Sequence, residues 1–316
     1  MSTSTRIALV GAGLVGASWA VVFARAGLAV RVYDAELGRL PQARAQVRES
    51  LSALCDAGML EAGPHAAPIE TITARIEWCD TLEAALEGAN YVQESIAENV
   101  AVKRELFAKL DAIAAPQVVL ASSTSAFPTS AFAGGLAGER RCLVVHPVNP
   151  PHLIPYVEIC GSGATAPETI GTALRLMQHV GQSPVHVRDE VTGFLLNRLQ
   201  WSLLAEACRL VDAGVVTPEA VDRALRDGLG RRWAFMGPFE VGDLNAPQGL
   251  GDYLRRFRPT IEAIDAASAE RPLQLDESLI ARLDADVKQR LAAPREARIA
   301  TRERRLLALA KALRDA

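Results

Sequence analysis

The sequence is short of aromatic residues, of paired cysteines and of net charge, and each shortage excludes a class of protein. Phe, Trp and Tyr make up only 5% of the 316 residues, which leaves few rings on which single-stranded nucleic acid could stack. The formal net charge is -3, whereas proteins that bind nucleic acid usually carry a basic excess. The five cysteines include no Cys-x-x-Cys pair, so we expect neither a zinc cluster nor a disulfide framework. We therefore predict no metal site, no nucleic-acid partner and a reducing compartment.

Residues 7–24 contain no charged side chain and together reach the length of a membrane span. They could also pass for the apolar part of a signal peptide. Three glycines, Gly11, Gly13 and Gly16, interrupt this run, which is better explained as a strand, a tight turn and a helix. We therefore expect neither a membrane span nor an export signal, and we predict a cytoplasmic protein.

Short apolar runs alternate with helical patterns over the first part of the chain. The helical patterns cover residues 14–26, 101–115 and 167–179, and a helical pair is predicted between residues 35 and 70. Such alternation is typical of α/β folds in which helices cover both faces of a doubly wound, mainly parallel sheet. The predicted strands are residues 6–10, 29–33, 91–96, 118–122, 142–146, 156–160 and 185–187.

The pattern changes near residue 190. From Thr192 onwards the apolar residues follow helical spacing, and no segment predicts a strand. We predict an N-terminal domain over residues 1–190, with the helical pair of 35–70 as an insertion, and an all-helical C-terminal domain over residues 191–316. The first helix of that domain is apolar nearly all round, which indicates burial between domains or subunits.

A glycine-rich turn lies between the first predicted strand and helix. Residues 11–16 read Gly-Ala-Gly-Leu-Val-Gly, a G-x-G-x-x-G pattern, and Asp34 ends the next strand. In this context the pattern predicts a Rossmann-type dinucleotide site, with the pyrophosphate at the helix N-terminus beside Leu14 and Val15. Asp34 is expected to bind the adenosine ribose and to repel a 2′-phosphate, which predicts NAD rather than NADP. The alternative is that the glycines only form a turn.

Six segments carry a resemblance to a known family: residues 11–16, 95–103, 122–125, 146–151, 193–199 and 228–238. The chain resembles the 3-hydroxyacyl-CoA dehydrogenase family, and within it the branch of lambda-crystallin and L-gulonate 3-dehydrogenase. The resemblance covers essentially the whole chain. It implies an NAD-binding domain followed by a helical substrate domain that forms a homodimer.

The resemblance also implies roles for single residues. His146 would be the general base, and Glu158 would orient it. Ser125 and Asn197 would hydrogen-bond the reacting oxygen of the substrate. The resemblance further implies that three residues lie at the cofactor, of which the first two are near the nicotinamide ribose: Glu98, Lys103 and Asn149.

The proposed base fits the chemistry of alcohol oxidation. Hydride loss from carbon requires a proton to leave oxygen, and histidine is a suitable acceptor near neutral pH. His146 ends a predicted parallel strand, where ligands bind in such sheets. It can meet Glu158 if the proline-rich loop between them folds their strands side by side. The alternative is a core histidine, and His152 on the same loop is the nearest rival for the role.

The other proposed site residues also have structural alternatives. Asn197 could bond across a domain interface, and Ser125 could cap a helix near Pro128. Glu98 and Lys103 could form a surface ion pair on one helix.

The charges near two segments bear on the substrate. Residues 35–70 contain three arginines, no lysine and five acidic residues, which is a poor match for the phosphates of coenzyme A. Arg232, with Arg231 as a second candidate, is expected to bind the carboxylate of a hydroxy acid, because guanidinium binds carboxylate bidentately. The alternative is a solvated or dimer-interface pair. A similar Arg-Trp-Ala-Phe segment occurs in carnitine 3-dehydrogenases, so it does not select one acid.

The sequence therefore predicts an NAD-dependent dehydrogenase that oxidises a 3-hydroxy acid, with L-gulonate as the first candidate. L-3-hydroxyacyl-CoA is the second, and carnitine or a short β-hydroxy acid the third. A non-catalytic, crystallin-like structural protein is the rival from another class. The presence of Ser125, His146, Glu158 and Asn197 argues against that rival, which would not require them.

Overall fold

The computed structural model describes residues 5–60 and 66–315. They form two compact units. The first comprises Met1–Arg198 together with Thr301–Ala316, and the second comprises Leu199–Ala300.

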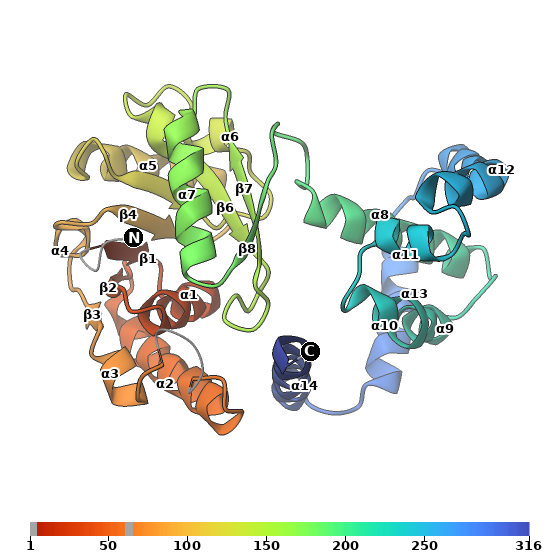
Figure 1. Cartoon of the computed structure of the whole chain (residues 1–316), viewed down its shortest axis with the longest axis horizontal. Helices are drawn as coiled ribbons and strands as arrows, with labels where there is room; N and C mark the ends of the chain where they lie inside the picture. The colour runs from red at the N-terminus through yellow and green to blue at the C-terminus, as the bar shows by residue number, and fades with distance from the viewer. Residues whose placement is uncertain (1–4, 61–65, 316) are drawn as a thin grey trace. The chain divides into compact units, whose positions relative to one another are not determined.

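The first unit is built on one eight-stranded sheet with the strand order β3-β2-β1-β4-β5-β6-β7-β8 (Figure 1). All neighbouring strands are parallel except β6 and β7, so the predicted mainly parallel, doubly wound sheet is confirmed. All seven predicted strands agree with the structure to within two residues at each end. Only β3 was not predicted, because three residues are too few to show an alternating pattern. The strands are β1 (Arg6–Val10), β2 (Ala29–Tyr33), β3 (Ile76–Trp78), β4 (Tyr91–Glu94), β5 (Val119–Ser122), β6 (Cys142–Pro147), β7 (Tyr156–Gly161) and β8 (Ser183–His186).

Helices cover both faces of this sheet, as predicted. Alternate residues of β1 point to opposite faces, so Ile7 and Leu9 join one apolar core and Ala8 and Val10 join the other. The first core includes α1 (Leu14–Arg25), α2 (Leu40–Asp56) and α7 (Pro167–His179). The second includes α4 (Leu82–Leu86), α5 (Val100–Ile113) and α6 (Thr129–Ala133). Burial on both faces explains why the strands read as continuous apolar runs.

The predicted helical pair between residues 35 and 70 is only partly present. The short turn η1 (Leu37–Arg39) leads into the long helix α2, and the next helix, α3, covers only Ile69–Thr73. Part of the predicted pair, residues 61–65, lies outside the described residues.

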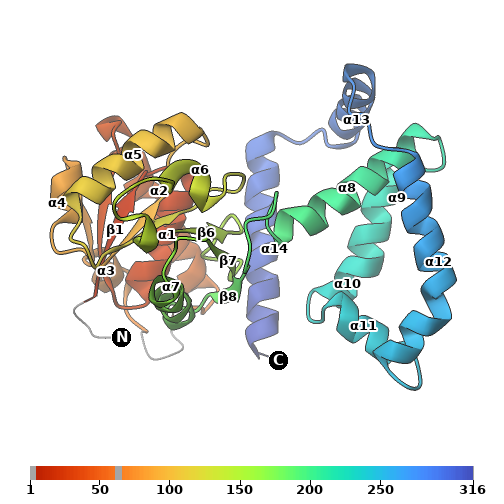
Figure 2. The same ribbon diagram turned by 90° about the horizontal axis from the view of Figure 1, so that it is seen from above.

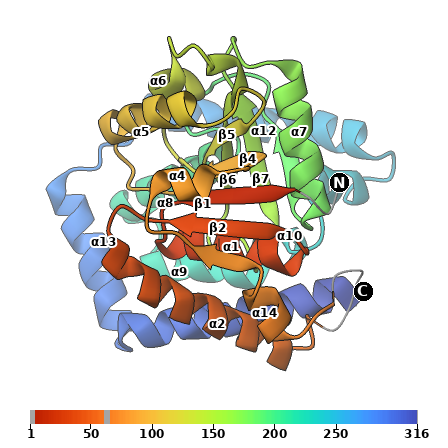
Figure 3. The same ribbon diagram turned by 90° about the vertical axis from the view of Figure 1, so that its left-hand side faces the viewer.

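The C-terminal helix α14 (Arg295–Asp315) is divided between the two units, whereas all of it was predicted to lie in the C-terminal domain. Its residues from Thr301 onwards belong to the first unit, where Leu306 and Leu307 pack against the core that α1 and α2 share. Figures 1 and 3 show α14 near α2, and Arg314 donates a hydrogen bond to the carbonyl of Gly58. Along the chain, the first unit continues to Arg198, and the predicted domain boundary near residue 190 stays a prediction. The assignment of one domain to the cofactor and the other to substrate and dimerisation stays a prediction.

The second unit is helical throughout (Figure 2), and no strand occurs after Thr192 in the part of the chain that the structure describes. Large apolar side chains on α8, among them Leu199, Trp201 and Leu204, are exposed in the single chain. None of the described helices combines the length and apolar character of a membrane span. The helices are α8 (Leu196–Asp212, which begins in the first unit), α9 (Pro218–Arg223), the π-helix η3 (Ala224–Leu229), α10 (Gly230–Trp233), α11 (Pro238–Leu244), α12 (Leu250–Glu270) and α13 (Glu277–Arg290).

Candidate active site

The predicted glycine turn joins β1 to α1, where strand order reverses between β1 and β4. Gly11 has a φ of 103°, and a β-carbon there would lie 2.6 Å from the carbonyl oxygen of Ser95. A β-carbon on Gly16 would lie 1.9 Å from the carbonyl oxygen of Gly11. One on Gly13, by contrast, would meet open space. Gly13 is the N-cap of α1, and the open space beside it lets a ligand approach the backbone, so this turn fits the pyrophosphate of a dinucleotide.

Asp34 stands at the end of β2 and braces the same turn. Its carboxylate accepts one hydrogen bond of 2.7 Å from the backbone N–H of Ala12 and another of 2.8 Å from that of Glu36. The side chain is therefore fixed beside the glycine turn, where the predicted contact with an adenosine ribose requires it.

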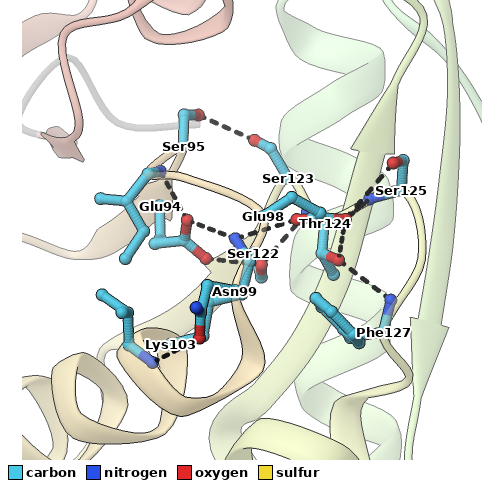
Figure 4. Close-up of polar contacts among 12 residues, drawn as sticks. Glu94, Ser95, Glu98, Asn99, Lys103, Ser122, Ser123, Thr124, Ser125 and Phe127 are labelled. Atoms are coloured by element: carbon cyan, nitrogen blue, oxygen red, sulfur yellow. Dashed lines mark hydrogen bonds and ion pairs between the residues drawn. The ribbon is translucent and has the colours of Figure 1, made fainter.

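A buried ion pair lies at the carboxyl ends of β4 and β5 (Figure 4). Lys103 is 1% exposed, and its Nζ lies 2.8 Å from Oε1 of Glu94, which is fully buried. The second oxygen of Glu94 accepts a 2.6 Å hydrogen bond from the hydroxyl of Ser122. Lys103 also forms an ion pair with Glu98, whose Oε2 lies 3.4 Å from Nζ. The predicted alternative of such a pair is therefore present, but Lys103 is buried rather than at the surface, and its shorter contact is to Glu94. Glu94 was not among the residues predicted from the sequence, although an acidic residue that ends an apolar strand is a usable signal.

Glu98 holds the loop that follows β5. Its Oε1 accepts hydrogen bonds from the hydroxyl of Thr124 and the backbone N–H groups of Ser125 and Ala126. Burial raises the pKa of Glu98, but Thr124, the charge of Lys103 and the N–H of Ser125 outweigh that effect and bring the pKa below its ordinary value. Glu98 therefore stays ionised and fixes the position of Ser125.

His146 and Glu158 face each other across the antiparallel strands β6 and β7. The register pairs the two residues directly, and His146 Nδ1 lies 2.9 Å from Glu158 Oε2. Because a carboxylate only accepts, the neutral imidazole carries its proton on Nδ1. Among the described residues nothing hydrogen-bonds Nε2, so its lone pair is available as a base. The predicted meeting of these side chains is what the structure shows.

The other oxygen of Glu158 is held by the start of α8. Oε1 accepts hydrogen bonds of 3.0 Å and 2.6 Å from the backbone N–H groups of Leu195 and Leu196, and one of 3.2 Å from the hydroxyl of Tyr156. Gly193 and Phe194, with φ angles of 78° and 50°, turn the chain so that these N–H groups point at the carboxylate. A positive φ is rare for phenylalanine, and such strain often marks functional sites.

Asn197 is the second residue of α8 and reaches the loop that Glu98 holds. Its Nδ2 donates a 2.9 Å hydrogen bond to the backbone carbonyl of Ser125. The hydroxyl of Ser125 lies 3.3 Å from Oε1 of Glu98. Ser125 and Asn197 are therefore brought together, whereas their contact with a substrate oxygen stays a prediction. Asn149, in the loop after β6, is exposed.

His152, the rival base, lies elsewhere in the first unit. Its Nδ1 is 3.1 Å from the hydroxyl of Ser18 in α1. Burial, assisted by the positive charge of Arg25, lowers the pKa of His152 to about 4. A base of that pKa is a poor proton acceptor near neutral pH. The ring of His152 bonds Ser18, whereas the ring that bonds the Glu158 carboxylate is that of His146.

Arg231 and Arg232 belong to the second unit, on the short helix α10 directly after the π-helix η3. Both side chains are exposed, and no hydrogen bond or ion pair engages the guanidinium of Arg232 among the described residues. π-helical turns often occur at functional sites. No cluster of three or more potential metal ligands occurs among the described residues.

Comparisons with known proteins agree with this geometry. Residues 6–190 match the family description "3-hydroxyacyl-CoA dehydrogenase, NAD binding domain", and residues 193–283 match "3-hydroxyacyl-CoA dehydrogenase, C-terminal domain". The chain is 45% identical to a lambda-crystallin homolog of Bos taurus, over 79% of this chain and 77% of that protein. It is 38% identical to an L-carnitine dehydrogenase of Burkholderia mallei, over 83% and 80% of the two chains.

Solved structures give the same result. The structure of an NAD+-dependent dismutase, 5-formyl-3-hydroxy-2-methylpyridine 4-carboxylic acid 5-dehydrogenase, superimposes with a TM-score of 0.82 and 27% identity over 98% of both chains. A 3-hydroxybutyryl-CoA dehydrogenase of Escherichia coli superimposes with a TM-score of 0.66 and 30% identity, over 77% of this chain and 50% of that one. With the glycine turn and the paired histidine, these matches show that the chain belongs to the 3-hydroxyacyl-CoA dehydrogenase family and is an NAD-dependent dehydrogenase.

Proposed function

We propose that the protein oxidises a 3-hydroxy acid to the 3-oxo acid with NAD, and that L-gulonate is its substrate. The observation that carries the reaction type is the buried pair of His146 and Glu158 at the carboxyl end of β6. It supplies a base with a fixed tautomer at the same carboxyl edge of the sheet as the glycine turn, which is expected to bind the dinucleotide.

The residues of this site would divide the reaction between them. NAD, when bound, accepts the hydride that leaves carbon 3 of the substrate. His146 takes the hydroxyl proton on Nε2, and Glu158 stabilises the imidazolium that results. Ser125 and Asn197 hold the reacting oxygen while the carbonyl forms. Glu98 and Lys103 position the loop of Ser125 and the cofactor beside it.

Three observations favour a small acid over an acyl-CoA. First, Arg39 forms an ion pair with Glu36, and Arg44 lies 5.4 Å above the ring of Trp78. Two of the three arginines between residues 35 and 70 therefore already have partners, and that segment is a weak attractant for coenzyme A. Second, Arg232 on α10 is exposed and unpaired within the described residues. Third, the sequence resembles the lambda-crystallin and L-gulonate 3-dehydrogenase branch, and lambda-crystallin homologs are among its relatives.

A substrate panel tests this proposal. The protein is incubated with NAD and L-gulonate, L-carnitine, 3-hydroxybutyrate or 3-hydroxybutyryl-CoA, and kcat/KM is measured from NADH absorbance. We expect L-gulonate to have the highest value. A higher value for L-carnitine or for the acyl-CoA would overturn gulonate and assign the other substrate. Binding of NADH without turnover of any compound would favour the crystallin-like structural role.

Replacement of Arg232 tests the carboxylate site. In Arg232→Met we expect KM for the acid substrate to rise about tenfold or more, because a hydrogen-bonded ion pair contributes about 1.5–3 kcal/mol. Arg223→Met is the matched control, since Arg223 on α9 pairs with Glu219 at the surface. An unchanged KM in Arg232→Met, with the control also unchanged, would remove Arg232 from substrate binding. Arg231→Met shows whether the neighbouring guanidinium takes part.

We further propose that the protein is a cytoplasmic homodimer. The second unit leaves many large apolar side chains exposed in the single chain, including Trp201, Phe235, Phe239 and Leu244. Exposed apolar surface of this kind is typical of a subunit interface. Sedimentation at micromolar concentration should give twice the 33.8 kDa mass of the chain, and a mass of one chain would contradict the dimer.

A further inference from the structure

The hydroxyl group of Ser123 receives hydrogen bonds on both of its lone pairs. Oγ of Ser123 accepts a 3.1 Å hydrogen bond from the indole Nε1 of Trp19 and one of 2.7 Å from Nε2 of Gln93. It also lies 2.9 Å from Oγ of Ser95 (Figure 4). A hydroxyl has two lone pairs and one proton. Both lone pairs are taken, so Ser123 must donate its proton to Ser95.

The orientation of Gln93 supports this assignment. Its Nε2 donates to the backbone carbonyl of Val145 at 3.2 Å, and its Oε1 accepts a 2.7 Å hydrogen bond from the hydroxyl of Tyr91. A carbonyl can only accept, so the amide nitrogen must face Val145, and its second hydrogen faces Ser123. The chain of donors therefore runs in one direction, from Tyr91 through Gln93 and Ser123 to Ser95.

Ser95 stands at the end of this chain, directly after β4. One of its lone pairs accepts from Ser123, so its own proton is free to be donated, and no acceptor for it occurs among the described residues. The backbone N–H of Ser95 donates a hydrogen bond to the carbonyl of Val10. A β-carbon on Gly16 would lie 3.8 Å from the β-carbon of Ser95. The hydroxyl is thus held at the glycine turn, between β1 and β4, and is only partly buried.

We propose that Ser95 is a further cofactor-binding residue, whose hydroxyl donates a hydrogen bond to an oxygen in the diphosphate–ribose part of bound NAD. The fixed direction of the donor chain makes Ser95 a donor before the cofactor arrives, so little reorganisation accompanies binding. The oxygens of a diphosphate and a ribose are acceptors that such a donor fits. This proposal rests on NAD binding alone and is independent of which 3-hydroxy acid is the substrate.

Titration of NADH fluorescence with the purified protein tests the contact without turnover. In Ser95→Ala we expect the Kd for NADH to rise about fivefold or more, as for loss of one hydrogen bond to a charged or polar group. The thermal unfolding midpoint without cofactor should stay close to that of the wild type. Ser130→Ala, which removes an exposed hydroxyl on α6, is the matched control and should leave the Kd unchanged.

Two further measurements locate the contact. ADP-ribose should lose affinity in Ser95→Ala as NADH does, because it keeps the diphosphate and both ribose rings. Ser123→Ala removes the donor behind Ser95 but leaves the Ser95 hydroxyl, so it should lower stability more and NADH affinity less. The proposal is overturned if Ser95→Ala binds NADH within twofold of the wild type, if ADP-ribose is unaffected, or if Ser123→Ala weakens NADH binding as much.

A structure of the wild-type protein with NAD gives an answer that does not depend on any variant folding. We expect Oγ of Ser95 within about 3 Å of a diphosphate or ribose oxygen. A separation greater than about 4 Å from every acceptor of the cofactor would contradict the proposal.

Discussion

Replacing Glu158 with Gln is expected to lower kcat by about a thousandfold or more, although the two side chains have nearly the same size. Three donors converge on Oε1 of Glu158: the backbone N–H groups of Leu195 and Leu196 and the hydroxyl of Tyr156. In the variant, the amide oxygen must face these donors. The amide NH2 group then faces Nδ1 of His146, where Oε2 stands in the wild type.

The consequence is a change of tautomer. A histidine whose Nδ1 accepts a hydrogen bond carries its proton on Nε2 and has lost the lone pair that acts as the base. Tyr156→Phe is the matched control, because it removes one donor to Glu158 and leaves the carboxylate in place. We expect that control to retain kcat within about tenfold, as loss of a single neutral hydrogen bond would predict.

Steady-state rates of NADH formation, together with NADH binding to each variant, check this prediction. Glu158→Gln should bind NADH as the wild type does, since Glu158 does not contact the glycine turn in the proposed scheme. Activity of Glu158→Gln within tenfold of the wild type would show that Glu158 does not set the tautomer of the base.

Replacing His146 with Gln should lower kcat by at least about a hundredfold, because the variant has no group that accepts a proton near neutral pH. Glutamine can still hydrogen-bond Glu158, so the contact between β6 and β7 is kept. His152→Gln is the control: its ring bonds Ser18, and its pKa of about 4 makes it a poor base.

The outcome is clear only if cofactor binding is measured beside turnover. We expect His146→Gln to bind NADH with a nearly unchanged Kd and His152→Gln to keep most of the activity. Near-normal turnover by His146→Gln would remove His146 from the mechanism. Loss of NADH binding in His146→Gln would instead assign it to the cofactor site.

Much of the first unit could be predicted from its sequence because local patterns determine it. Continuous apolar runs such as residues 6–10 correspond to strands buried on both faces, and G-x-G-x-x-G after such a run corresponds to the turn that the structure shows. The pairing of His146 with Glu158 could also be predicted, because the prolines between them favour a reversal of the chain.

The remaining features depend on contacts between distant residues. Glu98 and Lys103 do form an ion pair, but the burial of Lys103 against Glu94 depends on the packing of α5 on β4, which no local pattern shows. The positive φ of Phe194 is equally hidden, since its cause is the carboxylate of Glu158, 36 positions earlier in the sequence. Leu306 and Leu307 of α14 pack against the core of the first unit, but the sequence around them does not show which unit provides that surface.

The central claim is that the Nε2 lone pair of His146 takes the proton of the substrate hydroxyl. A structure of the protein with NAD and the substrate that the panel identifies tests it most directly. We predict Nε2 within about 3 Å of the 3-hydroxyl oxygen, with the Nδ1–Glu158 contact retained. An Nε2 atom more than about 5 Å from that oxygen, with another side chain bonded to the hydroxyl, would contradict the account.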